Sequence, residues 1–95
     1  MLDEPVELRC GLTLKNRLVK AAMSDALGDG TGGVTDAQCA LYRRWADGGT
    51  ALSIIGEVQT DRAYPESPAN LVVDHRAEAA GLARLAAAGE HDGAH

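Results

Sequence analysis

The sequence contains a glycine spacing, G-x-G-x-x-G, that holds a pyrophosphate in dinucleotide-binding proteins. It is formed by Gly28, Gly30 and Gly33. In that motif the first glycine directly follows a strand, and an acidic residue further along, here Glu57, binds the ribose. In this chain four residues separate Met23 from the first glycine, and Asp29 would lie beside the phosphates. We therefore expect residues 24–34 to form a loop and keep a dinucleotide-binding module as the weaker interpretation.

Three histidines and an aspartate in the carboxyl-terminal quarter of the chain are candidates for a metal cluster. They are His75, His91, Asp92 and His95. Gly89 and Gly93 would interrupt a helix that aligned them, so we expect no metal site there. Ser24 lacks the G-x-S-x-G turn that exposes a serine nucleophile, so we do not expect nucleophilic catalysis by serine either.

A hairpin and a strand are the first elements that the residue pattern predicts. Val6–Cys10 and Leu12–Leu14 alternate apolar and polar residues on either side of Gly11, which is typical of a short hairpin. Leu18–Met23 is short and mostly apolar. A run of that length favours a buried strand over a helix.

The first helix is expected to begin at Thr35. Thr35 and Gln38 form the Thr-x-x-Gln pattern of a capping box, and Gly48 and Gly49 predict where the helix ends. Apolar residues that recur every four positions predict one buried face. That face consists of Ala37, Leu41 and Trp45.

A second strand and helix follow the first pair. The stretch 51–55 predicts a strand that ends close to Glu57, and residues 61–74, which include Pro65 and Pro68, predict a loop. Asp74 is expected to cap a helix that continues to Gly89. Small apolar residues predict the face of this helix that packs against a neighbour. They are Ala79, Ala83 and Ala86.

The order strand, helix, strand, helix predicts an α/β fold in which the two main strands are parallel and the crossover is right-handed. Parallel sheets need several strands, so we expect the chain to be the opening portion of a larger α/β protein. Ligands of such proteins bind at the carboxyl ends of the strands. Met23-Ser24 and Glu57 follow the two strands and should lie on the same edge.

Composition limits the classes of partner. The 95 residues carry a net charge of −5 without a basic cluster, which argues against nucleic-acid and anionic-membrane binding. The sequence contains no bilayer-spanning apolar run and no signal-peptide pattern at its start, so we expect a cytoplasmic protein. Cys10 and Cys39 lack a redox or metal spacing, and we expect both to be reduced, buried thiols.

Several segments in order resemble one known family. Leu12–Ser24 (LTLKNRLVKAAMS) is similar to the opening of the NADH:flavin oxidoreductases, also called the old yellow enzymes. Thr35, 41–49, 52–58 and Asp61-Arg62 are similar to the segments that follow in those proteins. The resemblance covers nearly the whole chain.

The fold that this resemblance implies is a (β/α)8 barrel, of which the chain would supply an incomplete amino-terminal portion. Residues 1–16 would form a hairpin cap, 17–49 the first βα unit, 50–89 the second, and 90–95 a truncated tail. A complete barrel of this type needs about 250 residues.

The resemblance also implies a cofactor and a reaction: FMN, reduced by NAD(P)H, would pass hydride to a small-molecule substrate such as an activated alkene. The cofactor-binding residues carried over are Ala21, Ala22, Met23 and Ser24. The Ser24 hydroxyl would stabilise negative charge on the reduced flavin. Glu57 would also border the flavin, where relatives often have a small or amide residue. Ala26 takes a substrate-side position where many relatives have Tyr.

The catalytic residues of the family would lie beyond His95, so the chain alone is expected to be inactive and to bind FMN weakly. The alternative is a non-catalytic product of a truncated gene. Such a chain would have no function of its own, or would act by associating with other chains through open strand edges.

Overall fold

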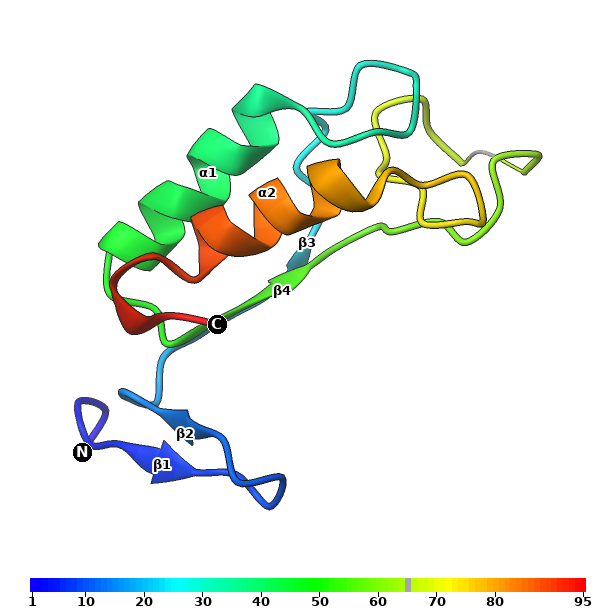
Figure 1. Ribbon diagram of the computed structural model, residues 1–95. Coiled ribbons are helices and arrows are strands. Elements are labelled where there is room, and N and C mark those ends of the chain that lie inside the picture. Colours follow the sequence, from blue (N-terminus) through cyan, green and yellow to red (C-terminus); the bar gives the residue numbers. More distant parts are fainter. Residues whose placement is uncertain (65) are drawn as a thin grey trace.

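The amino-terminal residues form a small hairpin. The computed structural model describes residues 1–64 and 66–95, and in it β1 (Val6–Glu7) pairs antiparallel with β2 (Thr13–Leu14). The hairpin projects away from the two helices (Figure 1). Its turn contains Gly11 at a φ of 89°, a conformation that glycine adopts without strain. The predicted hairpin is confirmed, although its strands are shorter than the alternating pattern.

The second sheet is a parallel pair. β3 (Val19–Met23) and β4 (Leu52–Ile55) lie side by side in parallel, with Val19 opposite Leu52 and Met23 opposite Ile55. The chain between them forms α1 (Asp36–Asp47), which gives the predicted strand–helix–strand order. Both helices cover the same face of this sheet (Figure 1). The other face is open: Val19 is 46% and Met23 47% exposed, so the prediction of a buried strand is wrong for most of β3.

The cap of α1 agrees with the prediction. The Thr35 hydroxyl accepts a hydrogen bond from the Gln38 amide, and the Gln38 side chain accepts one from the Thr35 amide. Gly48 ends the helix. Both hydrogen bonds satisfy backbone amides that the start of the helix would otherwise leave unpaired.

The predicted buried face of α1 is wrong by one residue. Ala37 is exposed, Leu41 is half-buried and Trp45 is 37% exposed. The residues that are buried instead are Gln38, Tyr42 and Ala46. Both rows recur every four positions and both contain apolar residues, so periodicity alone cannot choose between them. Packing against the sheet decides which row is buried, because Lys20 in β3 lies against the ring of Tyr42.

The second helix, α2 (Ala79–Gly89), packs beside α1 and is anchored by buried Leu85. Asp74 does not cap it. The residue before the helix is Glu78, whose side chain makes no capping bond, while the Asp74 carboxylate binds Arg62 and the Arg76 amide. The predicted contact face is also wrong, because its residues are exposed. They are Ala79, Ala83 and Ala86.

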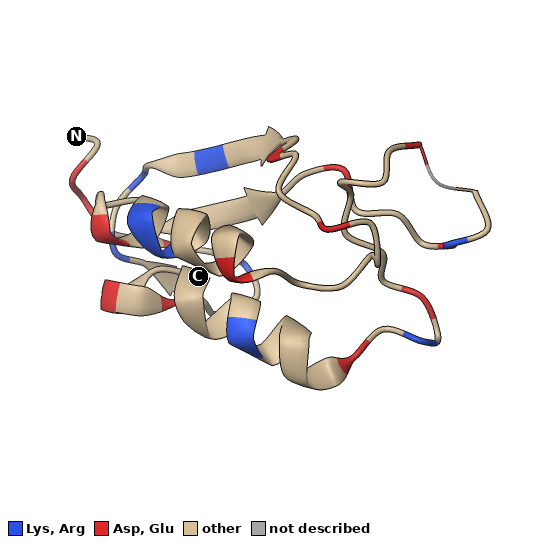
Figure 2. Cartoon of the chain, turned by 90° about the horizontal axis from the view of Figure 1, so that it is seen from above, with Lys and Arg blue, Asp and Glu red and all other residues tan. Residues whose placement is uncertain are grey.

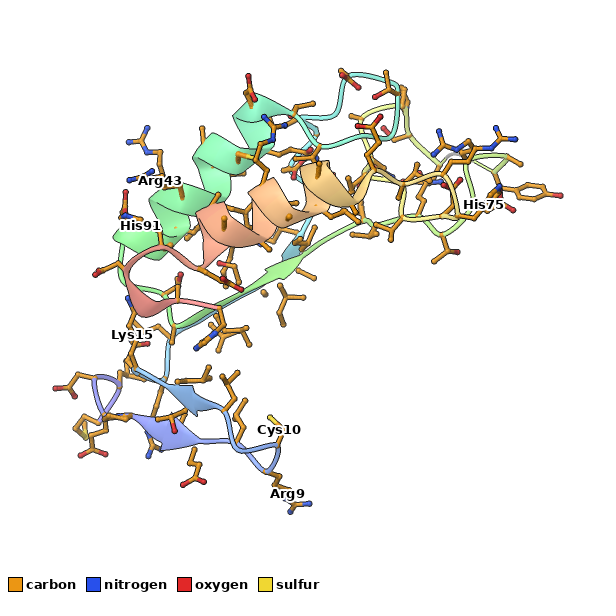
Figure 3. All side chains as sticks on the ribbon, in the orientation of Figure 1. Arg9, Cys10, Lys15, Arg43, His75 and His91 are labelled. Carbon is orange, nitrogen blue, oxygen red and sulfur yellow. The ribbon has the colours of Figure 1, made fainter. Side chains whose placement is uncertain are left out.

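The hydrophobic core lies between the helices, the sheet and the long loop after β4. Its buried centre consists of Tyr42, Leu71 and Leu85. Cys39 is half-buried against this core, whereas Cys10 is exposed at the hairpin turn (Figure 3). Both thiols are free, but the prediction of a buried Cys10 is wrong. Neither of the described helices has the length and apolar content needed to cross a membrane.

The loops after β3 and β4 meet beyond the strand ends (Figure 1). Gln59 forms a parallel bridge with Val72, and the Val72 amide donates to the Gly32 carbonyl at 2.8 Å. No helix or strand occurs in 24–34, as predicted. Most of the predicted loop at 61–74 is likewise irregular, while Pro65 lies outside the described residues.

The last residues bind the sheet instead of extending into solvent. After η1 (His91–Gly93), the His95 amide donates to the Ala51 carbonyl at 3.0 Å, and the His95 carbonyl accepts from the Ser53 amide at 2.8 Å. In a parallel pair of strands, one residue bonds to two residues of the neighbouring strand that lie two positions apart, as His95 does with Ala51 and Ser53. The carboxyl terminus therefore lies beside β4, and in Figure 2 it is on the side of β4 away from β3, the strand with the blue lysine.

Candidate functional site

The candidate site is the edge of the sheet at the carboxyl ends of β3 and β4. We call it the rim and define it as residues 21–26 with Gly56 and Glu57. Met23 and Ile55 are paired in the sheet, so the segments that follow them leave the strands side by side. The rim thus brings together all the residues that the sequence predicted at the two strand ends.

Gly56 allows the two halves of the rim to touch. A methyl group on Gly56 would overlap the backbone nitrogen, oxygen and carbonyl carbon of Met23. Backbone cannot rotate away as a flexible side chain can, so a larger residue at position 56 would push the strand ends apart. The close approach fixes the separation of the two main chains at the rim.

Two rim residues have an unusual backbone conformation. Ala26 has a φ of 53° and Glu57 a φ of 52°, in the left-handed region that residues with a Cβ rarely adopt. Holding such a residue there costs about 1–2 kcal/mol. Strain of this kind is concentrated at functional sites, where the surrounding structure maintains it.

The polar groups of the rim are accessible. The side chains of Ala21, Ala22, Met23, Ser24 and Glu57 are exposed. Within the described part of the chain, neither the Ser24 hydroxyl nor the Glu57 carboxylate takes part in a hydrogen bond. These two groups are therefore free to bind a ligand. Ala26 is also exposed and presents only a methyl group.

A charged side chain beneath the rim was not singled out by the sequence analysis. Lys20 is only 5% exposed, and its Nζ donates to the Ala21 carbonyl at 2.8 Å and the Ile54 carbonyl at 2.9 Å. Burial lowers the pKa of Lys20, and the nearby Asp25 carboxylate partly opposes this shift. A lysine within the apolar run Leu18–Met23 was the signal that could have indicated it.

Tyr42 covers Lys20 from the helix side. The Lys20 Nζ lies 5.1 Å from the centre of the Tyr42 ring, within the range of a cation–π contact. The Tyr42 hydroxyl is buried and has no hydrogen-bond partner among the described residues. Burial, together with the Asp25 charge, raises the pKa of Tyr42.

The glycine-rich loop, residues 28–33, bonds several of its own polar groups to one another. The Thr31 amide and hydroxyl both donate to the Asp29 carboxylate, at 3.0 and 2.6 Å, and the Gly33 amide donates to the Thr31 hydroxyl at 3.1 Å. The hydroxyl bond lowers the pKa of Asp29 and so favours its negative charge. Amides bound in this way, beside an anion, do not form a phosphate cradle.

An ion pair links the second loop to the start of the α2 region. The Arg62 guanidinium donates to both oxygens of Asp74, at 2.7 and 2.9 Å, and Asp74 is almost buried. The bonds from Arg62 hold the pKa of Asp74 well below its usual range. A cavity of about 520 Å³ lies beside this pair, against α2. It contains Arg76 and Arg84, but the carboxylate of Glu78 lines it as well.

The histidines do not form a cluster. His91 contacts Asp47 through Nδ1 and lies 3.2 Å from Arg43 through Nε2, while His75 lies at the opposite end of the molecule (Figure 3). Over 1–64 and 66–95, no three metal-binding side chains come together. Basic and acidic residues are distributed over both helices and the loops (Figure 2).

The rim can hold one edge of a flat ring system. The methyl side chains of Ala21 and Ala22 allow a ring to approach the main chain, and the Ser24 hydroxyl can donate a hydrogen bond to a ring heteroatom. The residues present therefore fit part of a flavin, which is held in proteins partly through main-chain groups.

Three curated proteins are similar to this chain. It is 47% identical over 74 residues to the NADH-dependent flavin oxidoreductase iliE of Hypocrea jecorina (strain QM6a), which covers 77% of this chain and 18% of that protein. Identity is 40% over 72 residues to iliE of Neonectria sp. (strain DH2), covering 76% and 9%. The identity to the NADH-dependent flavin oxidoreductase iccE of Talaromyces variabilis is 37% over 60 residues, which cover 63% of this chain and 14% of that protein.

These similarities confirm the resemblance inferred from the residues. No protein-family model matches the chain. The chain spans less than a fifth of the length of the curated relatives.

Proposed function

Because this chain is related to the NADH-dependent flavin oxidoreductases over as much as 77% of its length, we propose that it forms part of a flavin site. The proposed context is a (β/α)8 barrel, to which the chain contributes the first two βα units and the preceding hairpin. The proposed cofactor is FMN. The proposed reaction of the whole barrel passes hydride from NAD(P)H to a small electron-poor alkene or a similar acceptor.

The sheet supports the barrel. β3 and β4 are parallel, and His95 adds to β4 with the bonding of a further parallel strand. Val19, Met23 and Ile54 are nearly half exposed on strands whose other face is covered by the helices. Parallel sheets in proteins are covered on both faces, and a barrel would cover this one with its own interior.

The observation that carries the cofactor proposal is the rim. Its Ser24 hydroxyl and Glu57 carboxylate are free within the described chain, three of its side chains are alanine methyl groups, and its backbone is held in the left-handed region at Ala26 and Glu57. In a barrel, ligands bind at this end of the strands. Main-chain groups of Ala21–Ser24 would orient the ring, and the Ser24 hydroxyl would donate to it.

A bound flavin supplies the hydride-transfer chemistry between NAD(P)H and substrate. The chain's own residues position the ring and adjust its charge. A hydrogen bond from Ser24 would favour negative charge on a bound flavin ring, whereas the negative charge of the Glu57 carboxylate would disfavour it. Ala26 leaves space on the substrate side and supplies no proton.

Association with other chains is a second candidate, favoured by the uncovered sheet. An open β3 edge next to exposed Val19 and Met23 could pair with another strand. Sedimentation of the chain over a range of concentrations tests this candidate, because edge pairing predicts dimers that dissociate on dilution.

The flavin proposal is tested by following backbone amide resonances of the isotope-labelled chain during a titration with FMN. We expect weak binding, visible at millimolar FMN, with shifts concentrated at Ala21–Ser24 and Glu57. Ser24→Ala should weaken binding about fivefold, as expected for the loss of one hydrogen bond. Ser67→Ala, in the loop after β4, is the matched control and should leave binding unchanged.

Shifts that avoid the rim would contradict this proposal. Saturable FMN shifts at the glycine-rich loop would favour a dinucleotide-binding module instead. An equal effect of Ser24→Ala and Ser67→Ala would remove the role assigned to the Ser24 hydroxyl.

A further inference from the structure

Lys20 is buried, and its ammonium group forms hydrogen bonds to both strands of the parallel sheet. Its Nζ donates to the carbonyl of Ala21 in β3 and to the carbonyl of Ile54 in β4, at 2.8 and 2.9 Å. The Ala21 carbonyl belongs to the first residue of one half of the rim, and the Ile54 carbonyl lies two residues before Gly56 in the other half. A lysine ammonium has three N–H donors, so one group can satisfy both carbonyls at once.

The surroundings of Lys20 are suited to holding a cation. The Tyr42 ring lies 5.1 Å from Nζ on the α1 side, and Asp25 contributes a negative charge from the segment after β3. Ser53, the β4 partner of Lys20 in the sheet, has a buried hydroxyl without a partner in the described chain. Lys20 thus has a titratable ring on α1, a carboxylate in the rim and a hydroxyl on β4 as neighbours.

We propose that Lys20 is a positioning residue that ties the two halves of the rim together and orients their peptide groups through the Ala21 and Ile54 carbonyls. Gly56 brings the halves into contact, but contact alone does not fix their relative orientation. Charged donors make stronger hydrogen bonds than neutral ones, so the ammonium holds both carbonyls toward one point, its Nζ atom. The following peptides, at Ala22 and Ile55, are oriented as a consequence.

The consequence for a ligand rests on the proposed function. If the rim holds a flavin edge, Lys20 sets the direction of the main-chain groups that face it without touching the flavin. The positioning role itself requires no flavin, and it can therefore be tested on the unliganded chain.

The test is a pH titration of the backbone carbonyl carbons, observed by carbon-detected nuclear magnetic resonance. Both the Ala21 and Ile54 carbonyls should shift with one common midpoint, because both respond to loss of the same Nζ proton. Burial lowers the pKa of Lys20, so this midpoint should fall below about 10.4, the value of an exposed lysine. The pKa of Tyr42 is raised, and its ring carbons report its titration separately.

Lys20→Met should abolish both carbonyl titrations and speed amide exchange at the rim more than tenfold relative to α1. The matched control is Lys15→Met, because Lys15 also donates to a carbonyl, that of Asp92, but at the hairpin and tail. This control should leave the Ala21 and Ile54 titrations intact.

The proposal is overturned if the two carbonyls titrate at different midpoints, if only one titrates, or if both follow the Tyr42 ring. Uniformly faster exchange across the chain in Lys20→Met would also overturn it, because that result indicates a purely structural role. If Lys20→Met does not fold, the wild-type titration still decides. FMN plays no part in these measurements. A failure of the Lys20 proposal is therefore distinct from a failure of the FMN titration that tests the proposed function.

Discussion

The rim and the glycine-rich loop lie next to each other, and they use their polar groups in opposite ways. In the loop, Asp29 and Thr31 bind the local amides and each other. At the rim, Ser24 and Glu57 have no hydrogen-bond partner in the described chain, and Glu57 lies in the left-handed backbone region. The loop carries the better-known sequence motif, but the rim carries the groups available to a ligand.

This comparison shows that donors of a glycine motif can already be bonded within the chain, and donors bonded in this way are not available to a ligand. The glycine spacing at 28–33 provides flexible backbone, but the Asp29 carboxylate accepts bonds from the Thr31 amide and hydroxyl and places a negative charge in the loop. The rim has no short motif of its own. It was identified through the order of its strands and through a family resemblance that extends over many residues.

The largest expected effect comes from breaking the close contact in the rim. Gly56→Ala should destabilise the chain by about 3 kcal/mol, because the added methyl group meets Met23 backbone that cannot move aside. Urea unfolding, followed by the fluorescence of the single tryptophan, measures this change. Gly89→Ala is the control: a methyl group there meets no atom of the described residues within 4 Å and should stabilise α2 by about 0.5 kcal/mol. Equal stability of the two variants would refute the contact.

The next effect concerns how the ion pair between Arg62 and Asp74 makes the stability of the chain depend on pH in acid. The folded-state pKa of Asp74 is depressed, so the Arg62 pair contributes its full stability above about pH 4 and loses it as the pH falls through the lower, folded value. Asp74→Asn should remove this part of the acid dependence. Arg76→Ala, which keeps the ion pair, should retain the wild-type profile. Stability measured from pH 6 to pH 2 distinguishes them, and identical profiles for all three chains would contradict the role of Asp74.

A smaller effect should come from relieving backbone strain at the rim. Ala26→Gly and Glu57→Gly should each stabilise the chain by about 1 kcal/mol, because glycine adopts a positive φ without strain. Ala63→Gly, at an exposed loop position where φ is not positive, should instead destabilise it by about 0.5 kcal/mol. Denaturant midpoints provide the comparison. Destabilisation by the rim substitutions would mean that their backbone is not strained.

The smallest effect is expected for Ser24→Ala. Its hydroxyl is exposed and has no partner within the described residues, so stability should change by less than about 0.5 kcal/mol. Thr35→Ala makes a useful contrast, because it removes the α1 cap and should cost about 1 kcal/mol. Thermal unfolding measures both. A large loss for Ser24→Ala would show that the hydroxyl has a structural role at the rim.

Much of the fold could be predicted from local chemistry. The capping box at Thr35 and Gln38 gave the start of α1, and the strand–helix order gave the parallel pairing of β3 and β4. Because strand ends in a parallel pair share an edge, the sequence also placed Ser24 and Glu57 together. These features depend on residues close in sequence or on strand direction alone.

The remaining features depend on contacts between distant residues. Periodicity could not distinguish the row containing Trp45 from that containing Tyr42, because the difference is made by Lys20 on another element. Asp74 looked like a helix cap, but the bidentate pair with Arg62, twelve positions earlier, is the stronger interaction. The pairing of His95 with β4 likewise required the three-dimensional arrangement.

The most direct test of the difference between the two regions is a pair of titrations on one isotope-labelled sample, first with NADH and then with FMN, observed through the backbone amides. We expect FMN to shift Ala22, Met23, Ser24 and Glu57, and neither compound to produce saturable shifts at residues 28–33. Saturable NADH shifts at 28–33, with the rim unaffected by FMN, would contradict our assignment and make the glycine-rich loop the binding site.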